Sequence, residues 1–152
     1  MRPGARAAAR LVGAHLAGAL AVLALAGPAS AERPEILYML HCRGCHQPDG
    51  AGSQREGVPA LAGELGRFLT VPGGRAYLVQ VPGSAQSPLD DADLARLLNW
   101  MVERFGPEAV ARDFRRYTGP EVAEHRATRL TDVEAVRARL VKQFEATRAT
   151  SP

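Results

Sequence analysis

The residues with the clearest chemical potential are the two cysteines of this 152-residue chain, which lie together in the pentapeptide CRGCH. Cys42 and Cys45 are separated by two residues, and His46 follows directly. Cysteine pairs at this spacing serve zinc binding, dithiol redox exchange or the covalent attachment of haem. The rest of the sequence has to discriminate among these three chemistries.

The zinc and dithiol interpretations each leave something unexplained. A structural zinc site needs four ligands, and the chain has no second cysteine pair; His41 lies beside Cys42 and His125 is distant. A thioredoxin-like dithiol is expected in a βα pattern, and it gives His46 no role. Covalent haem attachment uses all three residues, because each thiol adds to a vinyl group and the following histidine ligates iron from the proximal side. The motif therefore predicts one covalently bound haem c.

The first 31 residues have the layout of a secretory signal peptide. Three arginines precede an apolar stretch over residues 11–27, and the small-residue sequence PASA ends at Ala31. The apolar stretch is short for a bilayer span of about 20 residues, so we expect cleavage after Ala31, with an uncleaved anchor as the alternative. The prediction is a periplasmic chain with no membrane span after cleavage.

Net charge carries no argument for a nucleic-acid partner. The formal charge of +3 includes 19 basic and 16 acidic residues. Cleavage after Ala31 would remove three of the basic residues and none of the acidic ones, which leaves the exported chain formally neutral. The positive balance therefore belongs to the precursor, and we expect no binding to nucleic acid.

The elements that must position the motif are predicted to be helical. A short helix over Pro34–His41 has proline in its first turn. A second short helix is expected over residues 73–81. The strongest signal follows Asp90, a natural N-cap, with an apolar stripe at helical spacing that ends at Phe105. Two stretches rich in Gly, Pro and Ser are predicted loops, residues 47–63 and residues 82–88.

The last third of the chain is predicted to be a helical extension. Thr118-x-x-Glu121 and Thr131-x-x-Glu134 both match the capping-box pattern. After the second box, one helix face carries Val133, Val136, Leu140 and Phe144. We expect that face to pack on the preceding domain, because a lone amphipathic helix of this length is marginal in water.

Taken in order, these segments resemble a class I monohaem c-type cytochrome of the bacterial periplasm. The matching segments are the CRGCH motif with Tyr38 four residues before it, the glycine-rich QPDGAG, VPALAG, and PLDDADLARLLNWM with Trp100. The resemblance covers residues 32–105. It implies an all-α fold, in which a small cytochrome c-like set of helices surrounds one covalently bound haem. It also implies that the carbonyl of Pro59 accepts the Nδ1–H of His46 and so orients the ligand.

The resemblance divides the chain into a signal peptide (1–31), a cytochrome c domain (32–105) and a helical C-terminal extension (106–152). It implies a one-electron carrier rather than an enzyme. The expected donor is a periplasmic dehydrogenase, and the expected acceptor is another cytochrome or an oxidase. The apolar wall of the haem site, or its packing, is expected to come from Leu94, Leu97, Leu98, Trp100 and Met101.

The chain departs from the family in the loop before the last core helix. Electron-transfer members usually carry a ligand methionine there, whereas residues 81–88 read VPGSAQSP. Met101 is the tentative sixth ligand, since its thioether suits haem iron, although a methionine on an apolar stripe is more often packing. Met39 and His41 are poorly placed before the motif, and His125 is expected on a solvated helix. The alternative is an open sixth site, which would bind or sense small ligands.

Overall fold

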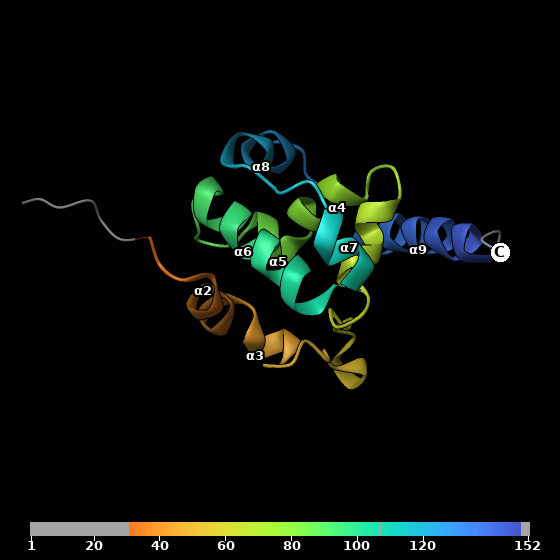
Figure 1. Cartoon of the computed structure of the whole chain (residues 1–152), viewed down its shortest axis with the longest axis horizontal. Coiled ribbons are helices and arrows are strands. Elements are labelled where there is room, and N and C mark those ends of the chain that lie inside the picture. The colour runs from red at the N-terminus through yellow and green to blue at the C-terminus, as the bar shows by residue number, and fades with distance from the viewer. Residues whose placement is uncertain (1–30, 107, 150–152) are drawn as a thin grey trace, which may run out of the picture. The chain divides into compact units, whose positions relative to one another are not determined.

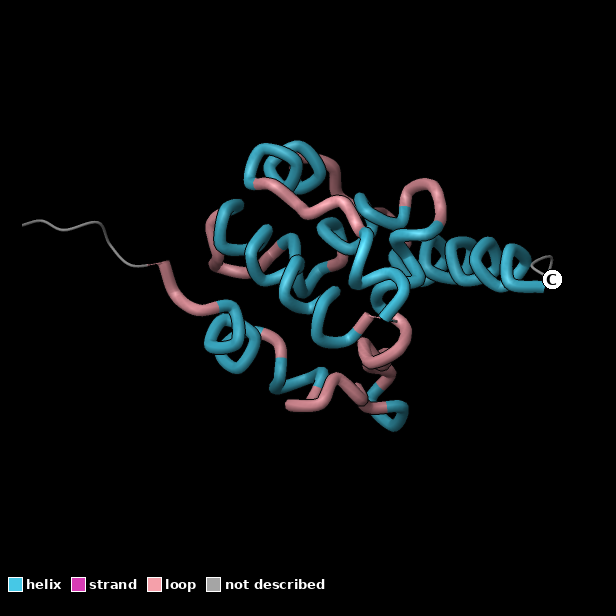
Figure 2. Tube along the Cα trace, viewed as in Figure 1, coloured by secondary structure: helices cyan, strands magenta, loops and turns pink. Residues whose placement is uncertain are grey.

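A computed structural model describes residues 31–106 and 108–149 of the chain (Figure 1). The predicted signal peptide, apart from Ala31, lies outside the described residues. The described part consists of helices and connecting turns, and its one β-type pairing is an isolated bridge between Ser53 and Val58 (Figure 2). The expectation of an all-α fold is confirmed for this part of the chain.

The helices follow one another with short connections. In chain order they are α2 (Pro34–His41), α3 (Arg43–His46), η1 (Gln54–Glu56), η2 (Leu65–Thr70), α4 (Gly74–Gln80), α5 (Pro82–Ala85), α6 (Asp91–Phe105), α7 (Glu108–Asp113), α8 (Gly119–Arg126) and α9 (Val133–Ala149). The elements η1 and η2 are 3₁₀ helices. No described helix has the length and apolar character that crossing a membrane requires.

The predicted helices α2, α4 and α6 are confirmed to within a residue or so of their ends. Each of the two predicted loops contains a short helical turn, η1 within residues 47–63 and α5 within residues 82–88. The predicted loop over residues 82–88 begins with the single turn α5, because Pro82 suits the first turn of a helix. The six-residue 3₁₀ helix η2 was not expected, since a segment of that length shows no clear apolar period.

The core is centred on α6, which lies between α2 and α8 (Figure 1). Asp90 caps this helix as predicted, because its Oδ1 accepts a hydrogen bond of 2.7 Å from the Asp93 amide. The buried apolar side chains of α6 are Leu94, Ala95, Leu97, Leu98, Met101, Val102 and Phe105. The predicted stripe is therefore the face that builds the core.

An aromatic cluster joins α2 to the far end of α6. Tyr38 is 1% exposed, and its ring centroid lies 5.4 Å from that of Trp100 and 5.1 Å from that of Phe105. Rings at these distances attract one another in tilted arrangements. The cluster fixes the helix that leads directly into the CRGCH motif.

The C-terminal extension packs into the same core. Leu140 and Phe144 of α9 are buried, and the Phe144 ring meets the Phe68 ring of η2 edge-on at 5.4 Å. Val133 and Val136 are partly buried against the core. The expectation that this face packs on the rest of the chain is confirmed.

The two capping predictions fare differently. Thr118 caps α8, since its hydroxyl accepts from the Glu121 amide at 3.4 Å. The Glu121 carboxylate, however, bonds to arginines rather than serving as the second half of a box. The Thr131 cap is wrong, because Asp132 Oδ1 accepts from the Ala135 amide at 2.9 Å and the helix starts one residue later. A carboxylate is at least as good an N-cap acceptor as a hydroxyl.

Candidate cofactor pocket

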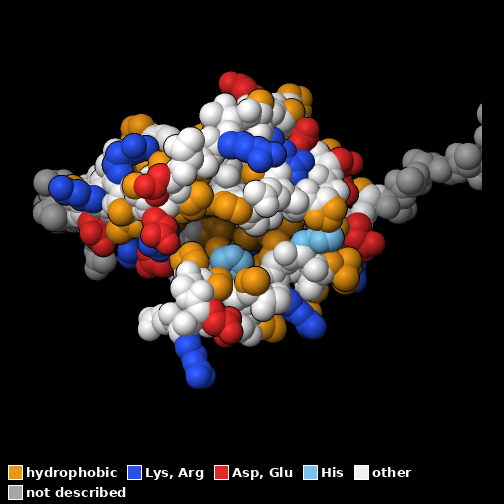
Figure 3. Space-filling view, turned by 180° about the vertical axis from the view of Figure 1, so that it is seen from behind, with side chains coloured by type: hydrophobic (Ala, Val, Ile, Leu, Met, Phe, Trp, Pro, Cys, Tyr) orange, Lys and Arg blue, Asp and Glu red, His pale blue; other side chains and the backbone are white. Residues whose placement is uncertain are grey.

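A cavity of about 520 Å³ lies against the CRGCH segment. Space-filling Figure 3 shows a hollow lined by hydrophobic side chains, with histidine side chains beside it. The apolar side chains that line the cavity include Leu61, Leu65, Phe68, Leu78, Val81, Leu94, Leu97, Leu98 and Met101. The volume and the apolar lining are those of a site for a small molecule or cofactor.

All five residues predicted to hold or ligate a cofactor line this one cavity: Cys42, Cys45, His46, Pro59 and Met101. Of the predicted apolar wall, Leu94, Leu97 and Leu98 line it as well. Trp100 is not among the lining residues, and it contacts Tyr38 and Phe105 instead. Trp100 therefore takes part in the packing of the wall rather than in its surface.

The two thiols are free and differ in exposure. Cys42 is partly buried, whereas Cys45, within the short helix α3, is exposed. Burial, and secondarily the nearby Cys45, raises the pKa of the Cys42 thiol to about 11. Dithiol exchange needs a thiolate near neutral pH, so the raised pKa of Cys42 disfavours that interpretation of the motif.

His46 has the orientation that a metal-binding histidine needs. Its Nδ1 lies 3.2 Å from the carbonyl oxygen of Pro59, the contact that the family resemblance implies. Because a carbonyl only accepts, Nδ1 carries the hydrogen, and the lone pair of the neutral ring stays on Nε2. Burial lowers the pKa of His46, partly opposed by the bond to Pro59. The ring is thus kept neutral, as metal ligation requires.

Turn geometry brings Pro59 to His46. Gly52 has φ of +69°, and a Cβ there would lie 2.6 Å from the carbonyl oxygens of Val58 and Pro59. The glycine therefore lets the two segments approach closely, and its amide donates to the His46 carbonyl at 3.1 Å. On the other side of the histidine, the Tyr38 hydroxyl donates to the Gln47 carbonyl at 2.6 Å. The backbone of His46 and of the next residue is thus fixed by hydrogen bonds from two other segments.

The cavity also has a wall formed by the loop between α4 and α6. The lining residues of this loop are Val81, Pro82, Gly83, Ser84 and Ser87. They offer aliphatic side chains and two hydroxyls, which are weak ligands for haem iron compared with His, Met or Cys. The departure from the family noted in the sequence therefore holds for this wall of the site.

Arg126 of α8 fixes this loop, and sequence reasoning missed it. Its guanidinium donates to Ser84 O (3.2 Å), Ser87 O (3.1 Å), Ser87 Oγ (3.0 Å), Leu89 O (2.9 Å) and Asp91 Oδ1 (2.8 Å). These acceptors lie 35 to 42 residues before the arginine. All of these bonds come from Nη1 and Nη2, while Nε is buried without a partner among the described residues, and no local pattern in the sequence predicts the arrangement.

Three other candidates from the sequence are placed differently. His125 lies 3.8 Å from a carboxylate oxygen of Glu121 and does not line the cavity. Met39 is 39% exposed and is not a lining residue either. His41 does line the cavity. The C-terminal extension adds lining residues that sequence reasoning also missed, Val133, Glu134 and Arg137.

The donor set fits a haem better than a metal held by protein side chains. Within the described residues, no three or more His, Cys, Asp or Glu side chains are grouped so that they could hold a metal ion. A porphyrin brings four nitrogen ligands of its own, so it needs from the protein one oriented histidine, two free thiols and an apolar cavity. Each of these is present.

Comparison with known proteins gives two related sequences. One cytochrome c-552 of Thermus thermophilus is 31% identical over 130 residues, which cover 74% of this chain and 87% of the relative. A second Thermus thermophilus cytochrome c-552 is 32% identical over 108 residues, covering 59% of this chain and 82% of that protein. No family model matches the chain, and the search of solved structures gives no significant match.

Proposed function

This chain belongs to the c-type cytochromes, which carry electrons on covalently attached haem c, and we propose that it is a one-electron carrier of the periplasm. When bound, the haem supplies an iron that takes up and releases single electrons. The observation that carries the proposal is the convergence of Cys42, Cys45 and His46 on one apolar cavity.

We assign each residue of the motif a separate task. Cys42 and Cys45 would hold the haem, each thiol adding its sulfur and its hydrogen across a vinyl group to give a thioether. His46 would ligate the iron through Nε2, while its Nδ1–H donates to the Pro59 carbonyl and raises the basicity of the ring. The apolar walls keep water out, which is one of the factors that set the reduction potential.

Met101 is our candidate for the sixth ligand. It is 7% exposed on α6, and within the described residues it is the one methionine that lines the cavity. A thioether ligand gives a compact one-electron centre with a relatively high potential.

The alternative is an open sixth position that binds or senses small ligands. The observation in its favour is the loop over residues 81–88, whose lining side chains are aliphatic or carry a hydroxyl. An iron with an open position takes up CO, whereas an iron with a filled sixth position resists it.

We further propose the cellular compartment of the protein and its electron-transfer partners. Cleavage of residues 1–31 would release a periplasmic chain, with residues 32–105 as the cytochrome c domain and 106–152 as its extension. Electrons would come from a periplasmic dehydrogenase and pass to another cytochrome or an oxidase. These partners are expected from the family resemblance.

The proposal is tested with protein produced together with haem-maturation machinery. Haem that stays on the chain in a denaturing gel is expected, and a chain that emerges without haem would contradict the proposal. The reduced spectrum with and without CO then separates the two alternatives: no response to CO supports the carrier, and an immediate shift supports the open site.

The conservative variant Met101→Leu tests the ligand assignment. Leucine keeps the apolar volume but cannot ligate iron, so we expect the variant to fold and to bind CO. A Met101→Leu protein with an unchanged spectrum and no response to CO would exclude Met101 as the ligand.

A further inference from the structure

Arg137 on α9 lies at the wall of the cavity, and no described carboxylate pairs with it. Its side chain is partly buried, yet it has no hydrogen bond or ion pair within residues 31–106 and 108–149. Other partly buried arginines do have carboxylate partners: Arg67 pairs with Glu64, Arg75 with Glu121 and Arg126 with Asp91. The guanidinium nitrogens of Arg137 keep some access to solvent, so an acceptor from outside the chain can reach them.

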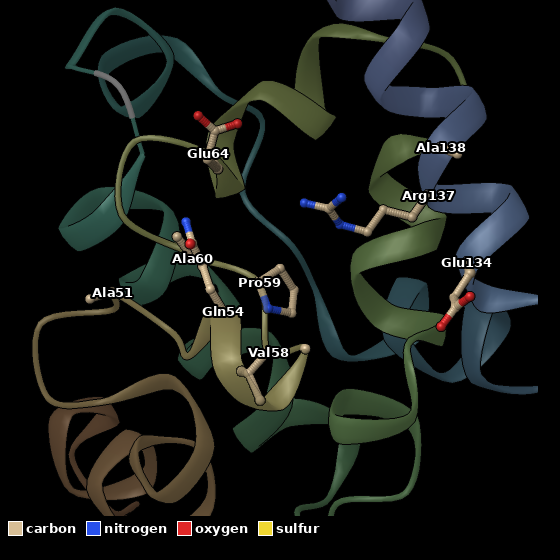
Figure 4. Close-up of a pocket in the computed structure, with 10 residues that line it drawn as sticks. Ala51, Gln54, Val58, Pro59, Ala60, Glu64, Glu134, Arg137 and Ala138 are labelled. Carbon is tan, nitrogen blue, oxygen red and sulfur yellow. The ribbon is translucent and has the colours of Figure 1, made fainter.

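Arg137 extends into space rather than along its own helix. Figure 4 shows the guanidinium reaching from α9 toward Pro59 and Glu64, while the Glu134 carboxylate points elsewhere. This space is a second cavity of about 540 Å³ that adjoins the first. Both cavities are lined by residues 57–60, Glu134 and Arg137.

The two cavities differ in which part of the motif they reach. Cys42, Cys45 and His46 line the first cavity and none of them lines the second. Arg137 therefore lies where the two cavities meet, and the cysteines do not border the second cavity. A haem joined to two cysteines has its vinyl groups at that edge, and its two propionate carboxylates project from another edge of the ring.

The lining of the two cavities offers one permanent cation to a carboxylate. Among the described residues that line either cavity, Arg137 is the single Arg or Lys, whereas Glu64 and Glu134 are acidic. Two propionates add negative charge, and a carboxylate that leaves water without a cation is costly. A guanidinium meets a carboxylate with two parallel N–H donors, which an ammonium group does not.

Tyr77 lies close enough to Arg137 for the positive charge to act on it. Its phenol lines the first cavity, where burial raises the pKa and the charge of Arg137 partly opposes that rise. The positive field of Arg137 therefore acts on groups in the cofactor cavity itself.

We propose that Arg137 binds a propionate carboxylate of the haem, so that the C-terminal extension takes part in holding the cofactor. The inference rests on the proposed function, because it needs the haem to be attached through the cysteines. It gives α9 a task beyond covering the core, since the helix brings a cation to a site built mainly by residues 41–101.

The test compares the reduction potentials of haem-loaded Arg137→Gln, Arg137→Lys and Arg139→Gln proteins. Arg139 is the matched control, because it lies two residues further along α9, is exposed and lines neither cavity. A cation beside the haem favours the reduced form, which carries one more negative charge. At a fixed applied potential, we expect the ratio of reduced to oxidised protein to fall about three- to tenfold in Arg137→Gln.

The two control variants distinguish the effect of a carboxylate pairing at Arg137 from the effect of losing one positive charge anywhere on α9. Arg139→Gln removes the same charge and is expected to change the ratio less than about twofold, since exposed charges are screened. Arg137→Lys keeps the charge without the two-pronged donor, so its ratio should lie between those of wild type and Arg137→Gln. Equal ratios in Arg137→Gln and Arg139→Gln, or a lysine variant no better than glutamine, would overturn the inference.

Haem stain on a denaturing gel distinguishes a failure of the inference about Arg137 from a failure of the proposed function. If haem is attached in wild type and both glutamine variants have equal potentials, only the inference about Arg137 fails. If wild type carries no haem, the proposed function fails and the inference falls with it. Far-UV circular dichroism of each loaded variant shows that the helices have formed.

Discussion

The two sides of the cavity are built in opposite ways. The side that carries Cys45 and His46 is a thin, largely exposed segment, held by turns and a few hydrogen bonds. The side formed by α6 and the loop before it is buried and apolar. It is held by Arg126 of α8, a helix that follows much later in the sequence. Thiols must be accessible to be joined to a cofactor, whereas the opposite wall, apart from the proposed ligand Met101, keeps its shape and excludes water. Attachment and stability are therefore carried by largely different residues.

The largest effect is expected when the thiols are removed, because attachment should depend on the exposed side of the cavity alone. The double variant Cys42→Ser, Cys45→Ser should lose all covalent haem, because a hydroxyl does not form the thioether. Haem stain on a denaturing gel measures this against wild type. Covalent haem retained in the double variant would show that attachment does not depend on this segment.

A change in the opposite wall is expected to lower the free energy of unfolding and to leave haem attachment intact. Arg126→Ala leaves the acceptors of residues 84–91 without their shared donor, and should lower the free energy of unfolding by about 2–3 kcal/mol. Urea unfolding of the loaded protein measures it, and covalent haem should still be present. Arg129→Ala is the control, because Arg129 is exposed and lies three residues further on. Equal midpoints for the two variants would mean that Arg126 does not secure the wall.

The extension adds an ion cluster whose contribution should depend on pH. Glu121 accepts from Arg75 at 2.9 Å and from Arg115 at 2.7 Å. Burial of Glu121 tends to raise the pKa of its carboxyl, but the hydrogen bonds and charges of the two arginines outweigh it and hold the pKa below its ordinary value of 4.5. A depressed pKa means that the stabilisation is complete above the ordinary value and is lost as the pH falls through the folded value.

Glu121→Gln should therefore cost about 1–2 kcal/mol at neutral pH and progressively less below about pH 4.5. Urea unfolding at several pH values measures the difference between the variant and wild type. Glu124→Gln, on the exposed side of the same helix, should show no such trend. A deficit in Glu121→Gln that stays constant down to about pH 3 would contradict the assignment.

The smallest expected effect lies on the thin side of the cavity. Burial, more than the nearby charges, raises the pKa of Tyr38 to about 12, so its hydroxyl stays protonated and donates to the Gln47 carbonyl. Tyr38→Phe keeps the ring contacts with Trp100 and Phe105 and removes this bond, which should cost about 1 kcal/mol. Urea unfolding checks the value. A loss above about 3 kcal/mol would instead indicate that the aromatic cluster had been disturbed.

Much of the site was predictable because its signals are local. The CRGCH spacing predicts haem attachment from five consecutive residues, and Asp90 with the apolar period of α6 predicts a helix that the structure has. The same local reasoning failed at Thr131, where the neighbouring Asp132 is the better acceptor for the start of α9. It also found no methionine in the loop over residues 81–88, and the structure keeps that loop at the cavity wall.

The sequence by itself determined the attachment motif, the helical periods and the all-α class, since each depends on residues within a few positions of one another. Only the tertiary structure decided that Met101 faces the cavity, that Arg126 secures residues 84–91 and that Arg137 reaches the cofactor site. Arg126 and Arg137 lie beside residues that are far away from them in the sequence. No local periodicity marks either arginine. Which arginine lies on the surface and which on the cavity depends on how α8 and α9 pack, and packing is settled by the whole core at once.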